Sequence, residues 1–275
     1  MEESAEVSVA VKKTAQESLV AALAKLTRPL TIPSPASRVV IKPSILDPGL
    51  PGNTSVELVR ALVRLFKEAG EVMIVESDNP FRTASEAFDG CGYSALTQLG
   101  AKLVNLTAEL RQPVAMAGYH FKTHDMPVLL LSDSFHVNSA TLKVEPENEL
   151  VWGGIKNLFG LLPDVDKRVF HSRLDDVLLD LLVSFRPDLT VMDLTEIVIG
   201  ERKAGEVRKV NGVVVGRDPV AVDAFCAGLF GFDPMTIPYL RRAHDLGLGE
   251  ALLDRIDVRG TEHQKSLLSD LIGRE

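Results

Sequence analysis

The stretch LKVEPENELVWGGIKNLFGLL, residues 142–162, decides how the second half of this chain folds. It predicts the end of a strand, a short acidic loop and then a helix. Apolar residues recur along it at the spacing of one helix face. They are Leu150, Val151, Ile155, Leu158, Phe159 and Leu162.

Two glycines, Gly153 and Gly154, fall in the first turns of the predicted helix, just before Lys156 and Asn157. A glycine inside a helix costs up to about 1 kcal/mol relative to alanine. The backbone is therefore expected to come close to another group. A ligand anion is one candidate, because a helix N-terminus offers free N–H groups and a positive dipole end. Close packing of the helix on a sheet is the other, and the residues favour neither.

Strands, loops and helices alternate around this stretch. Residues 38–42 predict a buried strand, residues 42–55 an irregular Pro/Gly loop, residues 56–70 an amphipathic helix and residues 72–75 another strand. This alternation is typical of a largely parallel sheet. The predicted fold is α/β, with two lobes (1–130 and 131–275), a cleft between them and a C-terminal hairpin. One continuous domain is the alternative.

Local patterns predict the remaining elements. Residues 206–216, EVRKVNGVVVG, predict the hairpin, with Asn211-Gly212 as its type I′ turn. Residues 107–127 predict a loop or a hairpin. Strands are predicted at 7–11, 102–106, 128–131, 136–144, 189–192 and 256–258. Helices are predicted at 15–26, 83–88, 174–185, 219–231 and 234–246, with a tail helix to residue 275.

Composition limits the classes of function. The 275-residue chain has a net charge of −8 and a pI near 5.4, which disfavours a general nucleic-acid binder but not a local basic pocket. We expect a cytoplasmic protein without a signal peptide or membrane span, because residues 1–13 are acidic and no long apolar run exists. A small anionic molecule is the expected partner, and homo-oligomerisation is left open.

The two cysteines, Cys91 and Cys226, match no zinc or cluster spacing. A cluster held by this chain alone normally needs about four thiolates, so an iron–sulfur cofactor is disfavoured. Buried thiols fit a reducing compartment. A divalent metal is left open. His120 and His124 have the i,i+4 spacing of a metal pair, but their surroundings are not helix-periodic, which favours solvated loop histidines.

Ligands of parallel sheets bind beyond the carboxyl ends of the strands. Polar residues expected on that edge are Lys42, Asn53, Thr54, Glu76 and Asp78. One lysine at a strand end is as often a solvated edge charge as a ligand group. Three lysines in separate β-loop-α units, namely Lys42, Lys143 and Lys156, are more specific. Together with Asn157 they predict a cationic pocket for a carboxylate, a phosphate or a developing oxyanion.

Several acidic residues have two interpretations. Asp218 is most simply a helix cap before Pro219. Asp223 lies on an apolar helix and needs a partner, either a lysine or a metal. Asp78 and Asp193 follow apolar runs and are metal ligands, general bases or turn formers. His171 is a candidate base or ligand, although a lone histidine in a charged loop is more often neither.

Five segments carry a resemblance to a known family. They are VVIKPSI, LKV, GGIKNLFGLLP with KRVFH, RPDLTVMD and GRDPVAVDAFCAGLFGFDP. In this order they resemble the domain-of-unknown-function 362 family, over about residues 7–260. Members are often labelled uncharacterised iron–sulfur centre proteins, and some carry a ferredoxin-like segment with clustered cysteines. This chain has no such segment, so the resemblance does not imply a cluster here.

The chain departs from the family pattern at three places. Lys42-Pro43-Ser44 stands where the family usually has Lys-Pro-Asn. Lys143-Val144-Glu145 stands where the family usually has Lys-Thr-His, so a typical histidine is absent. A glycine-rich loop expected after Asp193 is replaced by LTEIVIGERKAGE.

Three function hypotheses follow. The first is an enzyme or cofactor-handling protein that holds a small anion with the three lysines, and uses Asp78, His171 or Asp193 as acid/base groups or metal ligands. The second is a non-catalytic binding or scaffold protein, whose lysines only pair with Asp223, Asp193 and Asp78. The third is an electron-transfer partner of an iron–sulfur system.

Overall fold

The computed structural model describes residues 5–31, 34, 37–261 and 265–266. Its strands are β1 (Ala5–Val11), β2 (Ser37–Pro43), β3 (Gly70–Glu76), β4 (Lys102–Asn105), β5 (Arg111–Ala115), β6 (Thr123–Pro127), β7 (Phe135–Glu145), β8 (Leu150–Trp152), β9 (Leu189–Ile199), β10 (Glu206–Gly216) and β11 (Ile256–Arg259). Its α-helices are α1 (Ala15–Leu23), α2 (Val56–Phe66), α3 (Ala84–Gly90), α4 (Gly154–Asn157), α5 (Leu174–Ser184), α6 (Pro219–Leu229) and α7 (Pro238–Asp245). Short 3₁₀ helices lie at Lys67–Ala69, Tyr93–Leu99, Val128–Leu131, Pro146–Asn148, Leu158–Leu161, Lys167–Arg173, Pro234–Thr236 and Leu253–Arg255.

Nine strands of the described chain form one sheet, in the order β11-β1-β10-β9-β7-β2-β3-β4, with β8 paired to β7. The run from β9 to β4 is parallel throughout, and β1 is parallel to β11. β10 is antiparallel to both of its neighbours. The predicted α/β class with a mostly parallel sheet is therefore confirmed.

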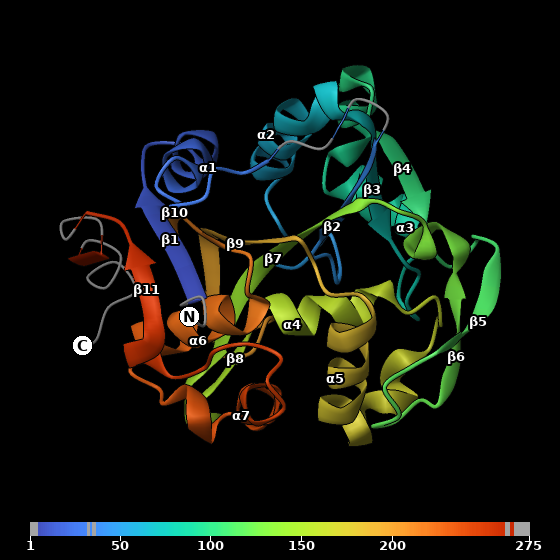
Figure 1. The fold of residues 1–275 in the computed structure, drawn as a ribbon. Coiled ribbons are helices and arrows are strands. Elements are labelled where there is room, and N and C mark those ends of the chain that lie inside the picture. The colour runs from blue at the N-terminus through green and yellow to red at the C-terminus, as the bar shows by residue number, and fades with distance from the viewer. Residues whose placement is uncertain (1–4, 32–33, 35–36, 262–264, 267–275) are drawn as a thin grey trace.

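Helices cover both faces of this sheet (Figure 1). One face carries α1 and α2, and the other carries α4, α5, α6 and α7. Strand residues alternate between the two cores: Val39 and Ile41 pack with the α1/α2 side, whereas Val40 packs on the opposite side. Because both faces of the sheet are covered by apolar cores, the polar residues of the strands are expected at the strand ends.

The helix caps follow the local sequence. The Thr14 side chain accepts from Glu17 N, and the Ser55 side chain accepts from Leu58 N, so each caps the helix that follows it. Asp218 caps α6 by accepting from Val220 N and Ala221 N, with Pro219 in the first turn.

The prediction of a turn at Asn211-Gly212 is wrong. Residues 206–216 form the single strand β10, which pairs with β9 and interrupts the ladder only by a register shift between Lys209 and Gly212. Asn211 has φ 55° at this irregularity. The positive φ that Asn and Gly tolerate therefore serves a bulge rather than a turn. The C-terminal hairpin exists, but its strands are β9 and β10.

Three other predictions need correction. Residues 128–131 form a 3₁₀ helix and not a strand. Residues 150–152 belong to strand β8, so Leu150 and Val151 do not share a helix face with Ile155. β9 continues past Asp193 to Ile199, which places Asp193 within a strand rather than at its end. The predicted loop or hairpin at 107–127 is a hairpin, β5-β6.

The sheet joins strands from both sides of residue 130. β1 lies between β10 and β11, and β2 lies between β3 and β7. The division into two lobes stays a prediction, and the shared sheet favours the alternative of one continuous domain. The tail helix predicted to residue 275 lies outside the described residues. Within them, no helix has the length and apolar character required to cross a bilayer.

Candidate functional site

A pocket of about 430 Å³ lies where β2, β3 and β7 end and α4 begins. Within the described residues its lining contains seven Lys or Arg side chains and two Glu side chains. The cations are Lys42, Arg82, Lys143, Lys156, Lys167, Arg168 and Arg202, and the acids are Glu76 and Glu145. Apolar lining comes from Ile45, Leu46, Phe81, Trp152, Phe159, Val165 and Leu174.

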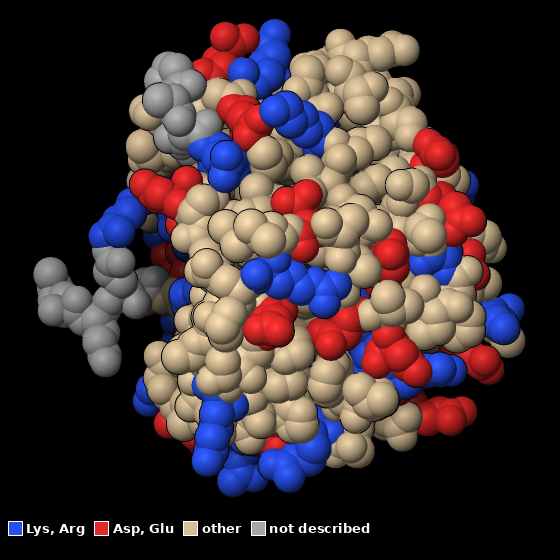
Figure 2. Space-filling view, turned by 90° about the vertical axis from the view of Figure 1, so that its right-hand side faces the viewer, with Lys and Arg blue, Asp and Glu red and all other residues tan. Residues whose placement is uncertain are grey.

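This positive excess is local. Figure 2 shows one face of the molecule, and on it Lys and Arg are interspersed with Asp and Glu rather than gathered into a single patch. The whole chain carries a net charge of −8. The cations of the pocket are therefore concentrated in an otherwise acidic protein.

Lys42 is held at the base of the pocket by a buried ion pair. Its Nζ lies 2.9 Å from Glu76 Oε2 and 2.6 Å from the Pro43 carbonyl oxygen. Burial lowers the pKa of Lys42, and the Glu76 carboxylate raises it in part. A Cβ at Gly160 would lie 2.6 Å from Lys42 Nζ, so a side chain at this position would displace the ammonium group.

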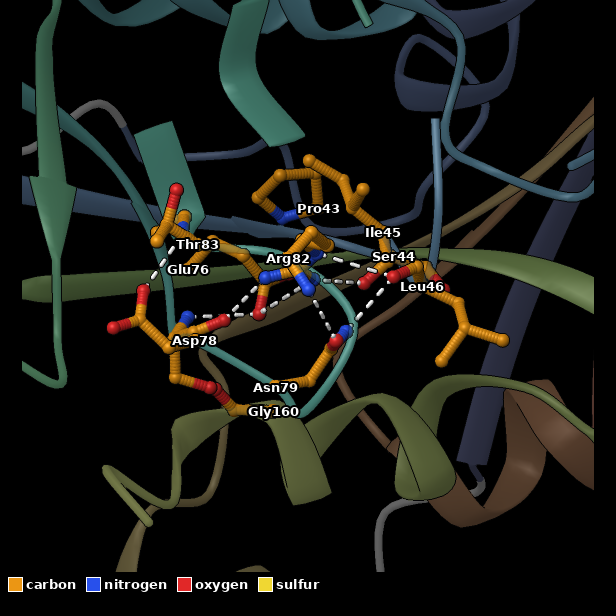
Figure 3. A network of polar contacts seen from close by, with 12 residues as sticks. Pro43, Ser44, Ile45, Leu46, Glu76, Asp78, Asn79, Arg82, Thr83 and Gly160 are labelled. Atoms are coloured by element: carbon orange, nitrogen blue, oxygen red, sulfur yellow. Dashed lines mark hydrogen bonds and ion pairs between the residues drawn. The ribbon is translucent and has the colours of Figure 1, made fainter. Parts of the chain in front are cut away.

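Arg82 closes the other side of Glu76. Its Nη2 lies 3.7 Å from Glu76 Oε1 and donates to the Ile45 carbonyl at 2.6 Å, while its other nitrogens bond the carbonyls of Leu46 and Ser77 (Figure 3). Glu76 thus sits between two cations. The guanidinium also fixes the loop after β2 against the loop after β3.

Two asparagines join α4 to the sheet. Asn157 Nδ2 donates to the Lys42 carbonyl at 3.0 Å and to Asn138 Oδ1 at 2.8 Å. Asn138 Nδ2 in turn donates to the Gly154 carbonyl at 2.8 Å. These bonds hold α4 in register with β2 and β7, and they place Asn157 in the pocket wall.

The double glycine serves close packing. A Cβ on Gly153 would lie 2.5 Å from Met192 Cε, and one on Gly154 would lie 2.9 Å from Thr190 Cγ2. Asp223 accepts from Gly154 N at 2.6 Å and from Ile155 N at 2.9 Å. The start of α4 is thus capped by an acid of this chain, which favours the alternative of close packing over a ligand anion at these N–H groups. Burial raises the pKa of Asp223 to about 7.

Lys143 and Lys156 are partly buried and line the pocket. Neither amine makes a hydrogen bond or an ion pair with any residue that the structure describes. Lys156 Nζ lies 4.0 Å from the centre of the Phe159 ring. Burial, together with the charges of Lys167, Arg202 and Lys42, lowers the pKa of Lys156 to about 7. Burial and the same kind of neighbours place the pKa of Lys143 well below its ordinary value.

Four cations of the pocket lining were not predicted from the sequence, namely Arg82, Lys167, Arg168 and Arg202. Lys167 Nζ donates to the Asp78 carbonyl at 2.8 Å, and burial lowers its pKa to about 8. Arg202 Nη2 donates to the Gly52 carbonyl at 2.9 Å, while its Nη1 is buried without a hydrogen-bond partner among the described residues. Arg82 and Arg202 lie in loops, and Lys167 and Arg168 begin a short 3₁₀ helix, so hydrophobic periodicity gives no signal at these positions. The charged runs DVDKR and GERK were the only indication.

Five of the eleven predicted site residues line the pocket: Lys42, Lys143, Lys156, Asn157 and His171. The structure thus brings together the three lysines, which was the main geometric expectation. Burial lowers the pKa of His171, and its ring lies 5.4 Å from that of Phe159.

The other acidic candidates bond to the backbone outside this lining. Asp78 accepts from Ala84 N at 2.7 Å and from Asn105 Nδ2 at 2.9 Å. Asp193 is buried and accepts from Ser55 N at 2.7 Å and from Thr195 N at 2.8 Å. Asp218 caps α6 and also accepts from Glu250 N at 2.8 Å.

Asn53 and Thr54 position the loop between β2 and α2. Asn53 Nδ2 donates to the carbonyls of Asp47 and Leu50, at 2.8 and 2.9 Å. Thr54 is buried, and its hydroxyl donates to the Ser139 carbonyl at 2.7 Å. Both side chains are engaged with the protein rather than turned into the pocket lining.

The two central histidines of the β5-β6 region lie apart from this pocket. His124 Nε2 lies 2.8 Å from Asp164 Oδ2, and the rings of His120 and His124 both pack near Phe121 and Phe170. No group of three or more His, Cys, Asp or Glu side chains suited to a metal ion occurs in the described part of the chain.

The fold and this pocket define the class: an α/β protein with a mostly parallel sheet and a cation-lined pocket at the carboxyl ends of its strands. The family model described as Domain of unknown function (DUF362) matches residues 39–228, which is more than half of the chain. The chain belongs to this family. A comparison with curated proteins finds no match.

Proposed function

We propose that this protein is a cytoplasmic enzyme or cofactor-handling protein that binds a small anionic organic molecule in the pocket. The main support is that three cations of the lining, Lys143, Lys156 and Arg202, form no ion pair with a residue that the structure describes. A buried guanidinium nitrogen without a hydrogen bond, such as Arg202 Nη1, costs free energy until an acceptor reaches it. An anion would supply that acceptor.

The pocket also suits the organic part of a ligand. Its volume of about 430 Å³ lies within the range of roughly 300–1,000 Å³ that is usual for small-molecule sites. Trp152, Phe159 and Leu174 give it apolar walls beside the cations. This mixture favours a compact carboxylate or phosphate ester over an extended polymer, and the acidic net charge argues against nucleic acid.

The proposed chemical roles follow from position. His171 is the one member of the predicted acid/base set that lines the pocket, so we assign proton transfer to it. Lys42 is neutralised by Glu76 and orients the floor of the pocket. Lys156, Lys143 and Arg202 hold the anion.

The scaffold alternative requires the three lysines to pair with Asp223, Asp193 and Asp78. In the described residues those carboxylates bond to backbone N–H groups and to Asn105, and Lys42 pairs with Glu76. A purely structural role for Lys143 and Lys156 has no such contact to support it. This difference favours the ligand-binding proposal.

Thermal denaturation with phosphate, sulfate or citrate tests the proposal. We expect each millimolar anion to raise the melting temperature of the wild-type protein by several degrees, because a ligand that binds only the folded state stabilises it. Lys156→Met should remove most of this shift without lowering the melting temperature in its absence. Lys122→Met, at an exposed position outside the pocket, is the control. An unchanged anion shift in Lys156→Met would contradict the proposal.

A further inference from the structure

Lys143 differs from the other lysines of the pocket. It lies near the end of β7, opposite Trp152 of β8 and Val198 of β9. Its side chain lines the pocket, and its amine makes no hydrogen bond, ion pair or aromatic contact with a described residue. Lys42, in contrast, is bonded to Glu76, and Lys156 lies over the Phe159 ring, which favours its charged form.

The surroundings of Lys143 disfavour a proton on its amine. Burial lowers its pKa well below the ordinary value, and the charges of Arg202, Lys156 and Lys42 lower it further. No carboxylate in the described residues pairs with it to offset this effect. An uncharged lysine amine keeps a free electron pair and is a nucleophile for carbonyl carbon.

The cations that lower the pKa of Lys143 also line the pocket that its side chain lines. A carboxylate bound by Arg202 and Lys156 would therefore share this pocket with the Lys143 amine. This arrangement selects ligands that carry an anionic group and a carbonyl group close together. A simple phosphate or tricarboxylate would occupy the cations but leave the amine unused.

We propose that Lys143 forms a Schiff base with a small oxo acid, whose carboxylate is held by Arg202 and Lys156. This inference rests on the proposed function, because the same cations hold the anion. It names the ligand class more narrowly: an anionic aldehyde or ketone.

The reaction is a condensation without change of oxidation state. The Nζ electron pair of Lys143 forms a bond to the carbonyl carbon, and the electrons of the C=O π bond move to oxygen. A proton moves from nitrogen to oxygen and gives a carbinolamine. A second proton on that oxygen lets it leave as water, and the nitrogen electron pair forms the C=N bond. Lys156, with a pKa of about 7, and His171 line the pocket and can exchange these protons.

Reductive trapping with glyoxylate and sodium cyanoborohydride tests the inference. The reagent delivers hydride to the carbon of the imine and water supplies the proton, which leaves a stable carboxymethyl group on the lysine. At pH 7 we expect peptide mapping by mass spectrometry to find this group on Lys143 at least about tenfold faster than on exposed Lys122, because a lowered pKa increases the uncharged fraction. Excess phosphate should slow the reaction at Lys143 only.

Two readouts separate this inference from the proposed function. Lys143→Met should lose the fast modification, whereas the phosphate shift of the wild-type protein reports anion binding independently of any modification. If Lys143 and the exposed lysines of the wild-type protein are modified at the same rate, while phosphate still raises its melting temperature, the inference is overturned and the proposed function is not. Absence of any phosphate shift in the wild type would overturn the proposed function. If Lys143→Met fails to fold, peptide mapping of the modified wild-type protein still tests whether Lys143 forms the Schiff base.

Discussion

At the scale of a single residue, Lys156 shows how a binding group can lower the stability of the fold. Its side chain reaches the pocket from a short helix and meets a ring and other cations, but no described carboxylate. Charged, it destabilises the empty protein. Under the proposed function, a bound anion would reverse that effect. Lys156 would then lower the stability of the ligand-free protein and raise its affinity for the anion.

The pH dependence of stability follows from the pKa of Lys156, which is about 7 in the folded chain and 10.5 for an ordinary lysine. Below pH 7 the amine is charged in both states, and the full cost of burial is present. Between pH 7 and 10.5 the unfolded chain binds the proton more strongly, so stability rises with pH. Lys156→Met should therefore raise the melting temperature most at pH 6, by about 2–4 °C for an effect on the order of 1 kcal/mol.

This gain should shrink steadily towards pH 10. Scans of both proteins from pH 6 to pH 10 in buffers without phosphate or carboxylates measure it. Lys122→Met should show no such trend, because Lys122 is exposed. If the melting temperatures of wild type and Lys156→Met differ by the same amount at all pH values, the charge of Lys156 does not cause the difference in stability.

At the scale of elements, the position of α4 depends on the cap from Asp223 and on two asparagines. α4 is only four residues long, so its own hydrogen bonds hold it weakly. Its orientation comes from contacts with α6, β2 and β7. Because α4 carries both Lys156 and Asn157, these contacts also set the geometry of the pocket.

Asp223→Asn tests this dependence. The amide can accept one backbone N–H but turns an NH₂ group towards the other, so one buried donor loses its partner. We expect a loss of about 1–3 kcal/mol in the free energy of unfolding. Urea denaturation at pH 7.5 measures it, and Asp254→Asn, at an exposed position, is the control. A change within about 0.5 kcal/mol, as is usual for a neutral surface substitution, would contradict the capping role.

Elements and site were predictable from sequence to different extents. The ends of the strands at Lys42 and Lys143 were predictable, because parallel strands buried on both faces appear in the sequence as continuous apolar runs that end at a charged residue. Asn211-Gly212 led to the wrong prediction of a turn, because a positive φ occurs in bulges as well as in turns. Only the pairing of β10 with β9 distinguishes the two. Arg82 and Arg202 were missed because the loops that carry them are brought to the pocket by tertiary contacts that no local pattern records.

At the scale of the whole molecule, an acidic protein places seven Lys or Arg side chains and only two Glu side chains around one pocket, among the residues that the structure describes. The sheet makes this possible: parallel strands β2, β3 and β7 end at one edge and deliver Lys42, Glu76 and Lys143 there. Loops and α4 then close the space above that edge. The central claim is that this enclosed positive charge exists to hold a small anion.

A crystal structure of the wild-type protein grown without anions of this kind and then soaked in citrate tests that claim most directly. We predict density for one citrate in the pocket, with carboxylate oxygens within hydrogen-bond distance of Lys156 Nζ and Arg202 Nη1. A well-ordered pocket that holds only water after the soak, with Lys143, Lys156 and Arg202 spread into solvent, would contradict the account.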